Sequence, residues 1–202
     1  LTILQYNVRH DGVYVDASVL SADFGGIPTN ICEGDDVSFT DASLGDVISW
    51  EWEFEGGNPA SSTEQNPVVN YAASGSYDVM LTVSDGTNNS SVTKEDYIHA
   101  TYTPETPDQP EGPTDVLTNQ TNFTVYETWC PNATGYIWEV IPEDMAVIVP
   151  GDTITKVKVY WDQSNSYSVE LKVKAENACG EGEFSDPLTI YVNWNTQIEN
   201  QE

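Results

Sequence analysis

The stretch that most constrains the fold of this chain covers residues 48–57 and reads Ile-Ser-Trp-Glu-Trp-Glu-Phe-Glu-Gly-Gly. Its apolar side chains all fall on one parity, and a serine and three glutamates fall on the other. An alternation with a period of two is typical of a β-strand with one buried face. We therefore expect a strand that buries four side chains, namely Ile48, Trp50, Trp52 and Phe54.

The same alternation recurs along the chain at short intervals. Strands are predicted at residues 20–24, 35–40, 68–71, 77–83, 92–100, 123–129, 136–140, 157–161, 169–175 and 188–192. No segment predicts a helix longer than one turn. Many short strands at this spacing predict an all-β chain built from immunoglobulin-like β-sandwiches.

A proline-rich segment divides these strands into two groups. Residues 103–113 hold four prolines and no larger apolar side chain, which predicts an extended, semi-rigid connector. We expect two tandem β-sandwiches joined by this linker, over residues 19–102 and 114–202. Residues 1–18, with an Asp-Gly pair that favours a hairpin, are expected to be a linker or the tail of an upstream domain.

The charge of the chain excludes some partners. The formal net charge is -27, from 33 acidic and 6 basic residues, and phosphate contacts need lysine and arginine, so nucleic acid is not an expected partner. No apolar run approaches the roughly 18 residues of a membrane helix, so no membrane insertion is expected. The composition favours a secreted or cell-surface module with a solvated acidic surface. Because Leu1 is not a methionine and residues 1–8 lack the basic start of a signal peptide, we expect the chain to be a piece of a longer protein.

Some of the acidic residues lie in turns at the expected ends of the sandwiches, where oxygen ligands could converge on calcium. The candidates are Asp35, Asp36, Asp41, Asp46 and Asp85. The alternative is that these carboxylates only solvate the surface. No EF-hand pattern is present, and no other cofactor is expected.

The three cysteines leave one without a partner. Cys130 and Cys179 each close a predicted strand, and the two strand ends are expected at the same pole of the second sandwich. We therefore expect a Cys130–Cys179 disulfide. Cys32 is expected to be a buried free thiol, with a partner elsewhere in a longer chain as the alternative.

No constellation for catalysis is evident. His10 and His99 lie in different segments, and the chain has no zinc-protease, nucleophile-elbow or phosphate-loop motif. Acidic pairs are too common at this charge to indicate glycoside hydrolysis. We expect no enzymatic activity.

The six tryptophans suggest a binding surface, because exposed aromatic rings stack on sugar rings and proline-rich peptides. Parity places four of them in the cores: Trp50, Trp52, Trp138 and Trp161. Trp129 and Trp194 are the candidates for exposure, and hence for binding a polysaccharide or protein polymer.

The first unit resembles a polycystic kidney disease (PKD) domain over residues 20–100. The residues that carry the resemblance are Gly34 to Asp41 with Ser43, Trp52-Glu53-Phe54 with Gly57, Asn66-Pro67 with Tyr71, and Gly75 to Val83. The loop after Phe54 departs from the family and resembles a variant found in secreted proteins of Bacteroidota.

Residues 107–193 resemble a second PKD-like or immunoglobulin-like module. The carrying residues are Pro110-x-Gly112-Pro113, Tyr136-Ile137-Trp138 and Ala175-Glu176-Asn177-x-Cys179-Gly180-x-Gly182. The resemblance implies non-catalytic spacer or accessory modules beside a peptidase, glycoside hydrolase or adhesin exported by the type IX pathway. Direct polymer binding is the alternative.

Overall fold

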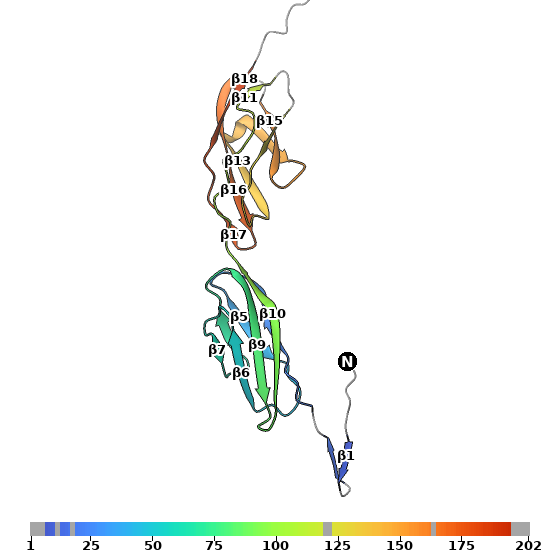
Figure 1. The fold of residues 1–202 in the computed structure, drawn as a ribbon. Helices are drawn as coiled ribbons and strands as arrows, with labels where there is room; N and C mark the ends of the chain where they lie inside the picture. The colour runs from blue at the N-terminus through green and yellow to red at the C-terminus, as the bar shows by residue number, and fades with distance from the viewer. Residues whose placement is uncertain (1–6, 11–12, 17–18, 119–122, 163–164, 195–202) are drawn as a thin grey trace, which may run out of the picture. The chain divides into compact units, whose positions relative to one another are not determined.

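The structure, a computed structural model, describes residues 7–10, 13–16, 19–118, 123–162 and 165–194. The chain divides into two compact units, Leu1–Thr101 and Tyr102–Glu202, and each has its own hydrophobic core. Among the described residues the one helical element is the 3-10 turn η1 (Glu143–Met145) (Figure 1). The predicted all-β class with two immunoglobulin-like β-sandwiches is confirmed.

A short hairpin precedes the first sandwich. β1 (Asn7–His10) pairs with β2 (Val13–Asp16) in antiparallel register, with Val8 opposite Val15. The predicted hairpin is therefore present, and the residues of its turn, 11–12, lie outside the described residues.

Two sheets form the first sandwich. The five-stranded sheet has the order β4 (Asn30–Cys32), β10 (Asn89–Thr101), β9 (Gly75–Ser84), β6 (Ser49–Phe54) and β7 (Ser61–Ser62). The three-stranded sheet has the order β3 (Phe24–Ile27), β5 (Asp36–Asp41) and β8 (Val68–Asn70). β4 runs parallel to β10, and the other pairs are antiparallel.

The aromatic face of β6 forms the centre of the first core, as its alternation predicted. Trp52 is fully buried, Phe54 is nearly so, and Trp50 is half-buried against the same cluster. Ile48 is the exception, because 65% of it is exposed. Its position precedes β6, and its side chain reaches the turn at Gly86, where an added Cβ would lie 3.0 Å from Ile48 Cδ1.

Two sheets also form the second sandwich. One has the order β11 (Asp115–Leu117), β18 (Leu188–Asn193), β16 (Tyr167–Asn177) and β13 (Gly135–Ile141), and β17 (Gly180–Glu181) pairs with β16. The other has the order β12 (Thr124–Glu127), β15 (Lys156–Trp161) and β14 (Ala146–Pro150). Trp161 is buried between these sheets and Trp138 packs against the core, as predicted.

The proline-rich segment belongs to the second unit and is not a connector between the two sandwiches, which corrects the expectation for residues 103–113. Its backbone pairs with the end of β12, since Glu111 and Glu127 exchange hydrogen bonds of 2.8 and 3.0 Å. Pro104, Pro107 and Pro110 are buried. Because a polyproline helix has three residues per turn, prolines spaced by three lie on one face. The segment is therefore the first extended element of the second unit.

Candidate functional site

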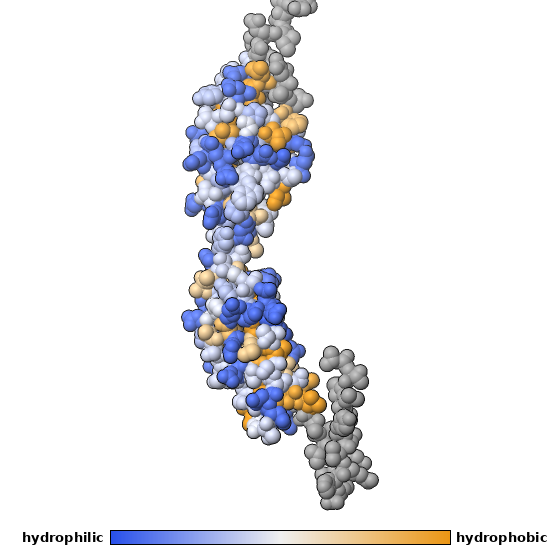
Figure 2. Space-filling view, in the orientation of Figure 1, coloured by the Kyte–Doolittle hydropathy of each residue, from blue (hydrophilic) through white to orange (hydrophobic). Residues whose placement is uncertain are grey.

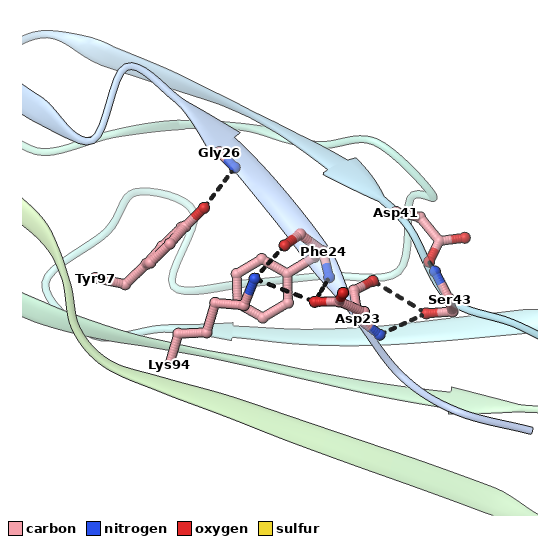
Figure 3. A network of polar contacts seen from close by, with 7 residues as sticks. All are labelled: Asp23, Phe24, Gly26, Asp41, Ser43, Lys94 and Tyr97. Carbon is pink, nitrogen blue, oxygen red and sulfur yellow. Dashed lines mark hydrogen bonds and ion pairs between the residues drawn. The ribbon is translucent and has the colours of Figure 1, made fainter. Parts of the chain in front are cut away.

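A lysine clamp closes the first sandwich around β3 (Figure 3). The Nζ atom of Lys94, on β10, lies 3.1 Å from Asp23 Oδ1 and donates a hydrogen bond to the carbonyl of Phe24. The same atom lies 4.5 Å from the centroid of the Phe24 ring and 5.2 Å from that of Tyr97. The Tyr97 hydroxyl accepts a 2.9 Å hydrogen bond from the backbone N–H of Gly26. Two side chains of β10 thus hold the edge strand of the opposite sheet.

The clamp is electrostatically satisfied. The hydrogen bond from Lys94, and then that from the Phe24 backbone N–H, lower the pKa of Asp23. Lys94 is the single lysine between residues 19 and 103. An ion pair of this kind beside aromatic rings stabilises the fold. All the contacts of the Lys94 amine described above are structural.

We expect Lys94→Met to destabilise the first unit by about 1–2 kcal/mol, because it removes a hydrogen bond to a buried strand and a cation–π contact. The measurement is urea unfolding of the chain, followed through the amide NMR signals of β9 for Lys94→Met and of β15 for Lys158→Met. Lys158→Met is the matched control, since the Lys158 partner Asp152 has a side chain that is 87% exposed. Equal losses in the two variants would contradict the clamp.

The structure does not bring the five calcium candidates together. Asp35 accepts a hydrogen bond from the Cys32 backbone, and Asp36 accepts one from Asn70. Asp85 caps its own turn through the backbone N–H groups of Thr87 and Asn88, which lower its pKa. Within the described ranges no group of three or more His, Cys, Asp or Glu side chains could hold a metal. A melting temperature that is higher in millimolar calcium than in EDTA would show that the chain does bind calcium.

Asp41 has a structural task. Its carboxylate accepts hydrogen bonds from Ser43 N (3.0 Å), Trp50 Nε1 (2.8 Å) and Gln65 Nε2 (3.1 Å). Burial opposes its ionisation, but these hydrogen bonds outweigh burial and hold its pKa below the ordinary value of 3.8. Asp41 thereby fixes the half-buried Trp50 and the loop before β8 (Val68–Asn70).

We expect Asp41→Asn to reduce the stability of the first unit by about 1 kcal/mol at neutral pH. A carboxyl with a lowered folded-state pKa stabilises above its unfolded pKa, and this stabilisation is lost as the pH falls through the folded value. The difference between wild type and variant should therefore be complete at pH 5 and should shrink below 3.8. Urea unfolding at pH 7 and pH 2.5 tests this, and a loss equal at both pH values would argue against it.

The cysteine predictions are wrong. Cys130 has a free, buried thiol, whereas Cys32 and Cys179 are disulfide-bonded cysteines. The Cys130 sulfhydryl donates to the carbonyl of Glu105 over 3.1 Å, so it is turned toward the proline-rich segment. The expectation that two strand ends lie at the same pole was therefore not enough to predict the direction of the Cys130 side chain. Burial, and then the charges of Glu105 and Asp108, raise the pKa of Cys130.

The structure places the two histidines in different strands. His10 lies in β1 and His99 lies in β10, where its Nδ1 atom is 3.0 Å from the hydroxyl of Ser76. The Ser76–His99 contact is exposed on the sheet.

The two tryptophans predicted to be exposed are exposed in the structure. Trp129 is 60% exposed and Trp194 is 37% exposed. Trp129 borders a shallow pocket of about 290 Å³ in the second unit, lined also by Asp108, Gln109, Glu111, Glu127, Thr128 and Thr155. Trp194 lies after β18, and its backbone N–H donates to Ser166. The sequence did not predict the pocket, because three of its seven lining residues belong to the proline-rich segment.

A larger, open groove of about 860 Å³ follows β6 and β7 in the first unit. Four glutamates line it, Glu51, Glu53, Glu55 and Glu64, together with the Ser61, Ser62 and Thr63 side chains. The groove includes part of the loop that departs from the PKD family. Figure 2 shows that hydrophilic residues cover most of the visible face of both units.

These features define two immunoglobulin-like β-sandwich modules whose large aromatic residues mostly fill the cores. Residues 21–100 match the family model described as the PKD domain, and residues 103–190 match the one described as the PKD-like domain. The chain belongs to this family as a tandem of PKD domains. Such domains are generally non-catalytic and typical of extracellular proteins.

No curated protein sequence matches the chain. Among solved structures it is similar to murine CEACAM1b, with 11% identity, a TM-score of 0.43, and coverage of 86% of this chain and 100% of that one. It is also similar to fibronectin(III)-like modules of Clostridium thermocellum CbhA, with 11% identity, a TM-score of 0.39, and coverage of 89% and 98%. No helix among the described residues is long and apolar enough to cross a membrane.

Proposed function

We propose that the two domains are non-catalytic spacer and accessory modules of a larger secreted or cell-surface bacterial protein. They would hold a peptidase, glycoside hydrolase or adhesive domain at a distance from its attachment point. The observation that supports this proposal is the path of the chain, which enters each sandwich at one pole and leaves at the other. The loop after β6 supports an origin in Bacteroidota, with export by the type IX pathway.

In the first unit, the entry lies beside the turn between β9 and β10. Ser21 forms a bridge with Leu44, and the Ala22 backbone donates to Ser90 near the start of β10. The exit, at Thr101, pairs with Cys32 at the far end of β10. A strand of 13 residues spans roughly 40 Å. The unit therefore adds nearly its full length to the path of the protein.

The second unit has the same arrangement. Its first carbonyl, at Tyr102, accepts 2.7 Å hydrogen bonds from Asn132 and from Asn177 at the end of β16. Its last strand leaves beside the start of β16, where Val192 is opposite Tyr167. Entry and exit are thus separated by the 11 residues of β16.

Distance measurement within one unit tests the spacer proposal. Nitroxide labels placed through non-natural amino acids at residues 19 and 101 should give a narrow distribution near roughly 40 Å in pulsed electron paramagnetic resonance. The distribution should not change when a polymer is added. A broad distribution, or one centred below about 20 Å, would contradict a rigid module that spans end to end.

A second candidate function is direct binding of an insoluble polymer, such as collagen or a polysaccharide. The observation that favours it is Trp129, which is 60% exposed at a pocket. Pull-down of the chain with collagen, chitin and other polysaccharides tests it. Saturable capture that is lost in Trp129→Ala or Trp194→Ala supports binding, and absence of capture leaves the spacer role alone.

A further inference from the structure

The pocket beside Trp129 is built by pairing between two segments that are distant in sequence. Asp108 N donates to the Trp129 carbonyl over 3.1 Å, and the Thr128 hydroxyl donates to the Asp108 carbonyl over 2.6 Å. The Thr128 backbone N–H donates to Thr155 on the other side. The backbone around the exposed indole is therefore fixed from both sides, so the pocket is preformed.

The charges around the indole are unbalanced. Three carboxylates line the pocket: Asp108, Glu111 and Glu127. Glu127 is neutralised by Lys156, whose Nζ atom lies 2.9 Å away. Within the described part of the chain, the Asp108 and Glu111 carboxylates have no hydrogen-bond or ion-pair partner. Two unpaired negative charges thus lie at the rim of an exposed aromatic ring.

The surroundings reinforce this negative potential. Burial raises the pKa of the adjacent Cys130 thiol, and the charges of Glu105 and Asp108 raise it further. The net charge of -27 also raises the local concentration of cations around the whole molecule. A neutral sugar could stack on the indole ring and donate its hydroxyl groups to the carboxylate oxygens. A cation would in addition be attracted by the negative charge of these carboxylates.

We propose that the Trp129 pocket binds an arginine side chain presented by an extended, basic polypeptide. The planar guanidinium stacks on the indole, and its N–H groups donate to the carboxylates of Asp108 and Glu111. Arginine suits this pocket better than lysine, because its flat, weakly hydrated group both stacks on a ring and forms a forked hydrogen bond. The inference rests on the second candidate function and names the chemistry of its ligand.

An NMR titration of the 202-residue chain tests the proposal. The probe is acetyl-Gly-Ser-Arg-Ser-Gly-amide at low ionic strength, and the readout is the indole N–H signal of Trp129, with the other five indoles as internal references. Peptides with lysine or glutamine in place of arginine, glucosamine oligomers and N-acetylglucosamine oligomers are the comparison ligands.

The arginine peptide should shift the Trp129 signal selectively, and its dissociation constant should rise about fivefold with lysine and more with glutamine. The double variant Asp108→Asn/Glu111→Gln should weaken binding about fivefold. Glu183→Gln and Tyr191→Ala are matched controls, an exposed acid and a 54% exposed aromatic outside the pocket, and should leave the affinity unchanged.

Equal affinity of the arginine and glutamine peptides, equal weakening by Glu183→Gln, or tighter binding of either sugar oligomer would overturn the proposal. If the peptide fails while polymer capture still depends on Trp129, this inference is wrong and the binding function stands. If both fail, the binding function is wrong as well, and the spacer proposal is still judged by its own distance measurement.

Discussion

Replacement of Trp52 by alanine should reduce the stability of the first unit by about 3–5 kcal/mol, through lost burial and the cavity that remains. Trp52 is fully buried, and its ring centroid lies 5.2 Å from that of Phe24, 5.7 Å from that of Phe39 and 5.6 Å from that of Phe54. Its neighbours come from both sheets, so no single strand can move to fill the space.

The indole of Trp52 also has a polar role. Its Nε1 atom donates a 2.9 Å hydrogen bond to the carbonyl of Glu64, which anchors the loop before β8. Trp52→Phe keeps a ring in the core but leaves that carbonyl without this donor. We expect it to have an intermediate loss of about 1–2 kcal/mol.

Urea unfolding of the 202-residue chain measures both variants, with amide signals of β9 reporting the first unit and those of β16 the second. Only the β9 transition should move. Trp129→Ala is the matched control, because its ring is 60% exposed and its removal creates no cavity. A loss under about 1 kcal/mol in Trp52→Ala would show that this residue is not the centre of the core.

Parity alone was sufficient to predict which aromatic residues enter the cores. It placed Trp52 and Trp161 inside and left Trp129 outside, because alternation along a strand determines which face each side chain joins. Parity could not place Ile48, which shares the buried parity but lies one residue before β6 begins and is 65% exposed. Where a strand begins depends on its pairing with other strands, and the alternation of one segment does not contain that information.

The Trp129 pocket depends on pairing between the proline-rich segment and the end of β12, which amino-acid composition does not predict. Residues 103–113 look like a connector when only their proline content is considered. Their prolines at intervals of three were the signal of one buried face, which a period of two or 3.6 does not detect. Because proline content alone predicts a connector, it does not associate Asp108 and Glu111 with Trp129.

Substitution of Gly112 by valine tests whether residues 103–113 are a connector or a packed element of the second sandwich. An added Cβ at Gly112 would lie 2.4 Å from Tyr126 Cδ1 and 2.9 Å from the carbonyl oxygen of Val125. Tyr126 is fully buried and its hydroxyl donates to Pro113, so neither the ring nor the backbone can yield easily. We expect Gly112→Val to destabilise the second unit by about 3 kcal/mol, at the upper end of overpacking effects.

A free linker would instead tolerate valine at Gly112 with no loss, since nothing would face the new side chain. Gly25→Val is the matched control, because an added Cβ there meets no atom within 4 Å. In urea unfolding, Gly112→Val should shift the β16 transition alone, and Gly25→Val should leave the β9 transition of its own unit unchanged. If Gly112→Val is as stable as wild type, the proline-rich segment is not packed against the second sandwich. The preformed pocket around Trp129 would then lose its basis, because that segment forms one of its walls.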